Sequence, residues 1–223
     1  MTPPTAGVPQ PALADLLRRV HELAGRADGP VLIGIAGAPG SGKSTLTAEL
    51  VQALVPPGAD PRAGTPVAHV PVDGFHLADA ELVRLGRTAR KGAPDTFDVA
   101  GYAALLRRVR AGESLVYAPA FERELEQPLA GALPVPAGVQ VVITEGSYLL
   151  LDDPGWAQAR ALLDEVWFVE VAPERRRERL RARHERFGKS PTAARDWVAG
   201  VDERNAELVV ASRPRADLVI ELP

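Results

Sequence analysis

From residue 31 onwards, short apolar runs alternate with longer amphipathic stretches along the chain. Continuous runs rich in Val, Ile and Leu are typical of strands buried on both faces, whereas apolar residues three and four positions apart predict helices. The predicted strands are residues 31–36, 67–72, 139–146, 165–171 and 216–220, and the predicted helices are 11–24, 45–55, 77–85, 98–110, 156–163, 173–186 and 192–211. This alternation predicts a doubly wound α/β fold with about five parallel strands and helices on both faces of the sheet.

Three stretches fall outside this alternation. Residues 117–128 are aromatic and charged, and together with 133–135 they predict a short hairpin or a flap on the substrate side. Residues 1–10 are rich in Pro and Thr and are expected to be frayed, and residues 56–66 predict a Pro/Gly loop. Because 223 residues can build one large core, we expect residues 1–223 to form a single domain.

The strongest chemical signal is a glycine-rich loop between the first predicted strand and the helix that follows it. Two glycines five positions apart, followed by Lys43 and Ser44, fit the P-loop pattern. In such a loop the backbone N–H groups and the helix N-terminus bind phosphates, while the lysine reaches the β- and γ-phosphates and the serine ligates Mg²⁺. The alternative is an ordinary glycine-rich turn. The P-loop pattern predicts a fold of the P-loop NTPase type, with ATP and Mg²⁺ as cofactors. The residues predicted to contact the nucleotide are Gly37, Ala38, Pro39, Gly40, Ser41, Gly42, Lys43, Ser44 and Thr45.

Two carboxylates follow predicted strands. Asp73 comes directly after the second strand, and Glu145 ends the third. In doubly wound sheets, residues just beyond the carboxyl end of a strand face the ligand crevice. Asp73 could alternatively cap a helix or form a turn, and many buried strands end in a polar residue. Beside a P-loop, Glu145 is predicted to take part in binding Mg²⁺ together with Ser44.

The predicted helix 173–186 carries seven arginines and three glutamates. A solvated, salt-bridged face is the ordinary explanation of such a pattern. Phosphoryl transfer, however, needs cations over the moving phosphoryl group, and a mobile arginine-bearing lid is a common source of them. With a hinge around Gly188, a helical lid over about residues 173–200 is therefore expected. The cations of the loop 87–97 leave two alternatives open, contact with substrate or phosphate and simple solvation.

Composition narrows the setting. The chain is 46% hydrophobic and 25% charged, which is typical of a globular protein. A net charge of −3 gives no overall nucleic-acid signature, and no apolar run approaches the length of a membrane span. Without cysteine, disulfides, thiol chemistry and cysteine metal sites are excluded. These features predict a cytoplasmic protein without nucleic-acid or membrane partners; monomer and homodimer both stay open.

From Val31 to Leu222 the chain resembles the uridine kinase / phosphoribulokinase / pantothenate kinase superfamily of P-loop small-molecule kinases. Asp73-Gly74-Phe75 and the segment 91–98 look like motifs of bacterial pantothenate kinases. Arg183-His184 with Gly188, and the segment 216–220, look more like the lid and last strand of uridine kinases. The nearest branch is the nucleoside/nucleotide kinase-like one, often labelled fructose-transport-system kinase.

The resemblance implies ATP-dependent transfer of the γ-phosphoryl group to a hydroxyl of a small metabolite, which is a sugar, a nucleoside or a pantothenate-like alcohol. Asp73 would be the general base, Glu145 would assist Mg²⁺ and Lys43, and Arg179 or Arg183 would cover the transferring phosphoryl. The candidate substrate-binding residues are Asp73, Phe75, His76, Lys91, Tyr117, Phe121 and Arg123. For His76 a structural role is the alternative.

Two departures leave the acceptor open. Uridine kinases have Asp-Ser-Phe-Tyr where this chain has Asp73-Gly74-Phe75-His76, and the chain is shorter than typical pantothenate kinases. A P-loop NTPase or GTPase switch without a small-molecule acceptor is the alternative function. A GTPase would normally carry a guanine-reading Asn/Thr-Lys-x-Asp motif, and none of the three lysines, at positions 43, 91 and 189, lies in one.

Overall fold

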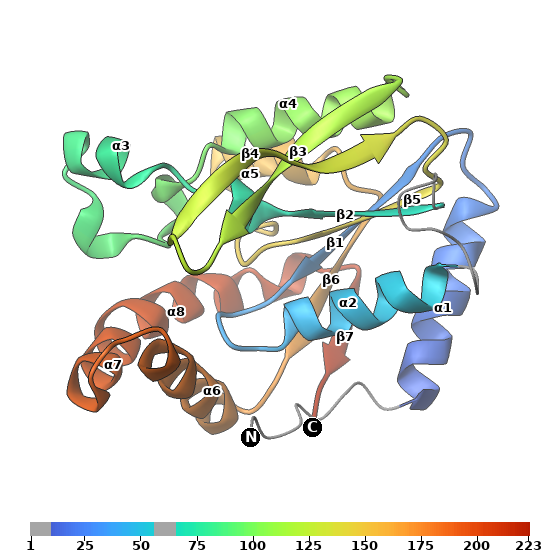
Figure 1. Cartoon of the computed structure of the whole chain (residues 1–223). Helices are drawn as coiled ribbons and strands as arrows, with labels where there is room; N and C mark the ends of the chain where they lie inside the picture. The colour runs from blue at the N-terminus through green and yellow to red at the C-terminus, as the bar shows by residue number, and fades with distance from the viewer. Residues whose placement is uncertain (1–9, 56–65) are drawn as a thin grey trace.

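A parallel sheet forms the centre of the computed structural model, which describes residues 10–55 and 66–223. Within this part of the chain the sheet has five strands in the order β2-β5-β1-β6-β7 (Figure 1). All neighbouring strands are parallel, as predicted. The strands are β1 (Val31–Ala36), β2 (Val67–Pro71), β5 (Val141–Glu145), β6 (Glu165–Glu170) and β7 (Leu218–Glu221). The predictions for the frayed start and for the Pro/Gly loop at 56–65 lie outside the described residues.

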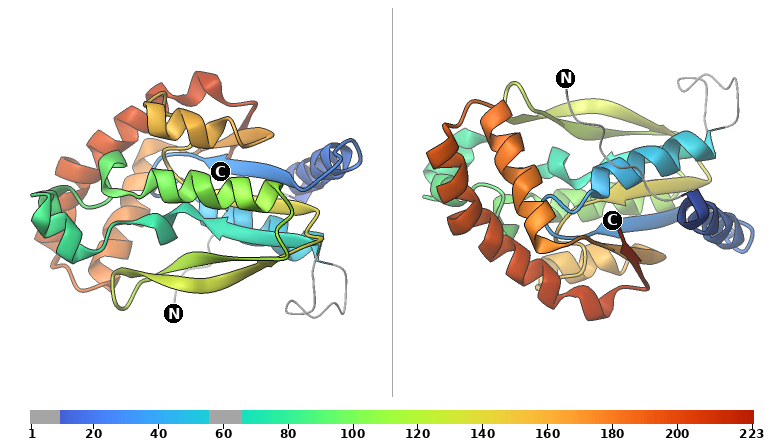
Figure 2. Two further views of the ribbon diagram at one scale, coloured as in Figure 1. Left: turned by 90° about the horizontal axis from the view of Figure 1, so that it is seen from above. Right: turned by 90° about the horizontal axis from the view of Figure 1, so that it is seen from below.

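Helices cover both faces of this sheet, which confirms the predicted α/β fold (Figure 2). One face packs against α1 (Gln10–Ala24) and α2 (Lys43–Leu54), and the other packs against α4 (Val99–Arg110), α5 (Pro154–Arg160) and α8 (Glu203–Ala211). Along β1, Ile33 and Ile35 belong to the core on the α1–α2 side, while Leu32 belongs to the opposite core. Because side chains alternate along a strand, an almost wholly apolar run supplies both cores.

An antiparallel hairpin lies outside the sheet, beside α4 (Figures 1 and 2). Its strands are β3 (Leu115–Glu122) and β4 (Gln127–Pro136). Val116 and Val135, which face each other across the two strands, are buried against the main core, whereas Tyr117, the residue after Val116, is exposed. The predicted hairpin is thus confirmed, and it is longer than the sequence indicated.

The remaining helices gather at the carboxyl edge of the sheet. They are α3 (Asp79–Arg84), α6 (Pro173–Arg186) and α7 (Pro191–Trp197), with short 3₁₀ turns at Thr88–Arg90 and Pro94–Thr96. A further 3₁₀ turn at Arg213–Arg215 precedes the amino end of β7. The prediction of one uninterrupted helix over 192–211 is wrong, because a π-helical turn at Val198–Asp202 separates α7 from α8. The second strand also ends one residue early, since Val72–Phe75 turn into a 3₁₀ helix.

No helix within the described ranges is long and apolar enough to cross a membrane.

Candidate active site

The strand order brings three predicted site elements together at one edge of the sheet. The P-loop follows β1, Glu145 ends β5, and Asp73 lies two residues beyond the end of β2. β5 lies between β1 and β2, and Glu145 is in register with Ile35 on one side and Pro71 on the other. Because the strands are parallel, their carboxyl ends share this edge, where open α/β sheets bind ligands.

The P-loop backbone depends on its glycines. Gly37, Gly40 and Gly42 have φ values of 149°, 80° and 98°, which residues with a Cβ rarely adopt. At Gly40 a Cβ would lie 2.9 Å from both the backbone oxygen of Arg176 and Cγ of Leu180. Helix α6 therefore packs directly on the loop, and a larger residue at Gly40 would push loop and helix apart.

Lys43 is held beneath the loop. It is 8% exposed, and its Nζ donates a hydrogen bond to the backbone oxygen of Ala38 at 3.2 Å. Burial lowers the pKa of Lys43, while the negative charges of Glu145 and Asp73 oppose that shift. An ammonium group has three donors, so this lysine keeps donors for phosphate oxygens.

Ser44 and Glu145 form a pair of oxygen donors next to the loop. The Ser44 hydroxyl donates to Oε1 of Glu145 at 3.1 Å. Burial raises the pKa of Glu145, and Asp73 raises it further, whereas Lys43 lowers it. A bound cation at this position would favour the ionised carboxylate.

The residues at the loop fit a nucleotide with Mg²⁺. Hydroxyl and carboxylate oxygens suit Mg²⁺, which keeps several waters and takes further ligands from substrate phosphates. In the described part of the chain no cluster of three acidic, His or Cys side chains could hold a metal ion, so this donor pair needs phosphate and water as further ligands. The buried hydroxyl of Ser41 also has no partner among the described residues, which leaves it free to meet a phosphate.

Four of the predicted acceptor-side residues meet beside this edge. Asp73 accepts a hydrogen bond from Nη2 of Arg123 at 2.7 Å, and the Arg123 guanidinium lies 4.9 Å from the ring centre of Phe121. The rings of Phe121 and His76 are 5.0 Å apart, and Nδ1 of His76 lies 2.8 Å from the backbone oxygen of Asp73. The four residues therefore form a closed ring of contacts, which the backbone oxygen of Asp73 completes.

The other three candidates lie in different surroundings. Lys91 forms an ion pair with Asp79 at 2.7 Å and lies 5.8 Å from the ring centre of Phe121, so it belongs to the edge of this group. Phe75 is 8% exposed and packs on Tyr102, which places it underneath the group. Tyr117 is 54% exposed on the outer face of the hairpin, and the structure does not bring it to the other candidates.

Four of the seven arginines of α6 bear on the site, and they fall into two pairs. Arg176 is buried and pairs with Glu203 on α8, and Arg177 pairs with the same carboxylate at 3.0 Å. These two tie α6 to α8. Arg179 and Arg183 have no hydrogen bond or ion pair with any described residue, so their guanidinium groups are available to a ligand.

The two available arginines point to different parts of the site. Nη1 of Arg179 lies 3.4 Å from the position that a Cβ on Gly42 would take, so it lies over the phosphate loop. Arg183 lies within electrostatic range of Lys43, Asp73 and Arg123. Burial lowers the pKa of Arg183, and repulsion from Arg123 lowers it further, so the charge of Arg183 acts on the acceptor side of the site.

Comparisons with known proteins give the same family as the geometry. The chain is 37% identical over 152 residues to the ATP-dependent kinase-like protein notR' of Aspergillus versicolor, covering 64% of this chain and 88% of that protein. It is 36% identical over 160 residues to a provisionally named uridine kinase of Schizosaccharomyces pombe, covering 69% of this chain and 66% of that protein. A crystal structure from Silicibacter sp. TM1040, provisionally named a fructose transport system kinase, superposes with a TM-score of 0.80 at 37% identity, over 93% of this chain and 98% of that one.

The chain belongs to the uridine kinase / phosphoribulokinase / pantothenate kinase superfamily of P-loop kinases. A family model, that of the methylmalonyl Co-A mutase-associated GTPase MeaB, matches residues 6–74. That match ends at Gly74 and covers less than a third of the chain, so Glu145, the hairpin and the arginines of α6 lie outside it.

Two polar residues beside this site were not predicted from sequence. The Tyr148 hydroxyl donates to the backbone oxygen of Gly92 at 2.5 Å, and Nδ2 of Asn205 donates to the same oxygen at 3.4 Å. They hold the loop that carries Lys91 between the end of β5 and helix α8. Tyr148 lies three positions after Glu145, so its place just beyond a predicted strand was the one available signal.

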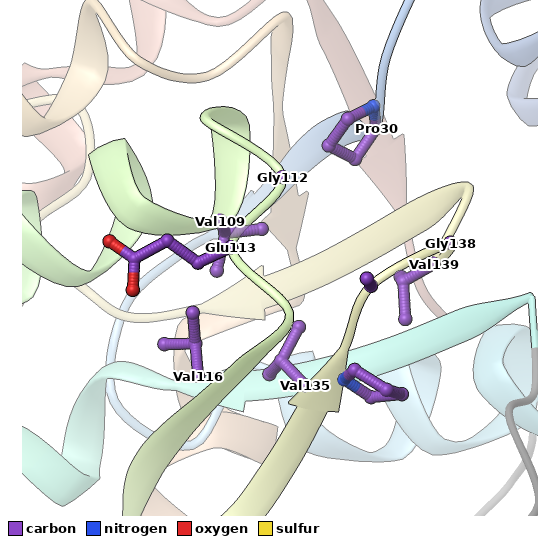
Figure 3. Close-up of a pocket in the computed structure, with 10 residues that line it drawn as sticks. Pro30, Val109, Gly112, Glu113, Val116, Val135, Gly138 and Val139 are labelled. Atoms are coloured by element: carbon purple, nitrogen blue, oxygen red, sulfur yellow. The ribbon is translucent and has the colours of Figure 1, made fainter.

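A small cavity lies at the other end of the sheet (Figure 3). It has a volume of about 40 Å³ and is bounded by Pro30 before β1, Val139 before β5, and Val109, Val116 and Val135. Its side chains are mainly apolar, and it is large enough for water but not for a metabolite. It is a packing void that adds no chemistry to the kinase.

Proposed function

We propose that this chain is a Mg²⁺-dependent phosphotransferase that moves the γ-phosphoryl group of ATP to a hydroxyl of a small metabolite. The observation that carries the proposal is the meeting of Lys43, Glu145 and Asp73 at the carboxyl ends of three adjacent strands. Phosphoryl transfer depends mainly on positioning and on charge neutralisation, and this arrangement supplies both.

On the nucleotide side, residues 37–45 would bind the phosphates through backbone N–H groups, and Lys43 would contact the β- and γ-phosphates. Ser44 and Glu145 would hold Mg²⁺, which supplies positive charge to the phosphate oxygens when it is bound. Arg179 would lie over the phosphates, and Arg183 would cover the phosphoryl group as it moves towards the acceptor.

On the acceptor side, Asp73 would take the proton of the attacking hydroxyl. Its carboxylate is bound to Arg123, so the guanidinium fixes the orientation of the base. His76 and Phe121 border the same space, Phe75 supports it from beneath, and Lys91 closes its edge. A role of Tyr117 in substrate binding would require the outer face of the hairpin to meet the acceptor.

The test is a coupled ADP-release assay with Mg-ATP across sugars, nucleosides, pantothenate and glycerate. We expect one acceptor class to accelerate ADP release, and Asp73→Asn to lower that acceptor-dependent kcat by about 10²–10⁴, the usual contribution of a general base. The Asn side chain keeps the hydrogen bond to Arg123 but cannot accept the proton.

Asp79→Asn is the matched control, because Asp79 also pairs with a cation but lies at the edge of the site. It should keep most of the turnover. Near-normal turnover of Asp73→Asn would remove Asp73 from its role. ADP or GDP release that no acceptor accelerates would favour the alternative function, an NTPase or GTPase switch, to which the partial GTPase match points.

A further inference from the structure

The proton on His76 can be located from its hydrogen bond. Nδ1 of the ring lies 2.8 Å from the backbone oxygen of Asp73. A carbonyl oxygen only accepts hydrogen bonds, so Nδ1 must carry a proton. Burial lowers the pKa of His76, with Arg123 and Lys91 acting in the same direction and Asp73 opposing them, so the ring stays neutral near pH 7. A neutral ring with its proton on Nδ1 has a bare acceptor lone pair on Nε2.

This Nε2 atom has no hydrogen-bond partner in the described part of the chain. The atom is also not fully buried, unlike Nε2 of His69, which is buried and has no hydrogen-bond partner among the described residues. The two cations that act on the His76 ring are already engaged, since Arg123 donates to Asp73 and Lys91 to Asp79 and to the backbone oxygen of Glu126. The lone pair is therefore left for a donor on a ligand.

The ring of contacts fixes this lone pair relative to the proposed base. Asp73, Arg123, Phe121 and His76 each contact the next, and the imidazole is also held 4.0 Å from the ring of Phe97. A ligand whose hydroxyl meets the Asp73 carboxylate thus has a hydrogen-bond acceptor at a set position close by.

We infer that the phosphoryl acceptor is a polyol, and that a second hydroxyl next to the phosphorylated one donates a hydrogen bond to Nε2 of His76. This inference rests on the proposed function and names its substrate class. His76 becomes a residue that determines specificity, since the hydroxyl that it binds is not the one that reacts.

Other donors fit less well. Arg123, Lys91 and Arg183 make the surroundings positive, which disfavours an ammonium group, and carboxylates or phosphates have no proton to donate at neutral pH. The faces of Phe97 and Phe121 suit the C–H side of a sugar-like molecule.

The experiment compares each acceptor with the analogue that lacks the neighbouring hydroxyl, in wild type and in His76→Phe. The probes are D-fructose, D-ribose and D-glycerate with their deoxy analogues, for example D-glycerate with 3-hydroxypropionate. In wild type we expect kcat/KM to fall at least about 10-fold on loss of this hydroxyl, since the bound analogue covers the acceptor without pairing it. In His76→Phe, which keeps a ring between Phe97 and Phe121, the ratio should fall to about one. His21→Phe, the same exchange at an exposed position of α1, should leave the ratio unchanged.

The outcomes separate the inference from the function. ADP release with a ratio that His76→Phe leaves unchanged overturns the inference and keeps the kinase. Absence of acceptor-dependent ADP release defeats both. A ¹⁵N spectrum of the histidine side chains gives a readout independent of turnover: a proton on Nδ1 of His76 is expected, and a proton on Nε2 of the neutral ring would overturn the inference.

Discussion

At the scale of single residues, His69 shows the cost of a buried polar atom. It lies on β2, and its Nε2 is buried without a partner among the described residues. Burial lowers the pKa of His69 to about 4, with Asp73 opposing the shift only weakly. The unfolded chain therefore takes up this proton below about pH 6.5, while the folded chain does so only near pH 4.

The contribution of His69 to the free energy of unfolding therefore falls as the pH decreases from about 6.5 towards 4, and it is constant above about pH 6.5. Between pH 7.5 and pH 5 wild type should lose about 2 kcal/mol more of its free energy of unfolding than His69→Phe, measured by urea denaturation. The other titrating groups contribute equally to the free energy of unfolding of both proteins, so their contributions cancel in the comparison. Parallel losses in both would mean that His69 is protonated in the folded state.

The acceptor group shows what sequence could not reveal at this scale. Asp73 and Arg123 are 50 positions apart, and neither the spacing nor the composition indicates that they meet. Strict alternation along the hairpin would put Tyr117 and Phe121 on one face. A register shift between Ala118 and Ala120 breaks the alternation, so Phe121 contacts His76 while Tyr117 faces outwards.

At the scale of elements, the hydrophobic pattern predicted the five strands because each is a short apolar run with a clear end. It failed at the long helix over 192–211. A π-helical turn adds one residue without changing the apolar or polar character of the segment, so periodicity does not reveal it. In the structure that turn ends at Asp202, which bonds His184 of α6 at 2.7 Å.

Helix α6 is the element whose function is most testable. Its glutamate-paired arginines serve packing, whereas Arg183 is available beside Asp73. Arg183→Ala should lower kcat by about 10² with little change in KM for ATP, because the lost charge acts mainly on the moving phosphoryl group. Steady-state kinetics with the best acceptor give both constants.

Arg181→Ala on the same helix is the matched control and should stay within about twofold of wild type, since this arginine has no counterpart in the proposed mechanism. If Arg183→Ala raises KM for ATP and leaves kcat unchanged, Arg183 binds the ground-state nucleotide and the cation over the transferring group must be sought at Arg179.

At the scale of the whole molecule, the sheet order explains why the P-loop and both carboxylates were predictable as one site. A parallel sheet collects the carboxyl ends of its strands at one edge, so a residue that ends a strand is placed by topology alone. No such rule predicts the positions of residues on the hairpin or on the helices after β6. Their places depend on tertiary packing between elements that are distant in sequence.

Because the site joins the central strands to α6, nucleotide binding should stabilise the folded chain as a unit. At 100 times its Kd, a non-hydrolysable ATP analogue with Mg²⁺ should add about 2.7 kcal/mol and raise Tm by about 5–10 °C. Lys43→Met should abolish most of this shift, and EDTA should reduce it if Ser44 and Glu145 hold Mg²⁺. Lys189→Met, which removes the lysine between α6 and α7, should retain it. A full shift in Lys43→Met would mean that the nucleotide binds away from the P-loop, and the proposed phosphotransfer at Asp73 would lose its donor.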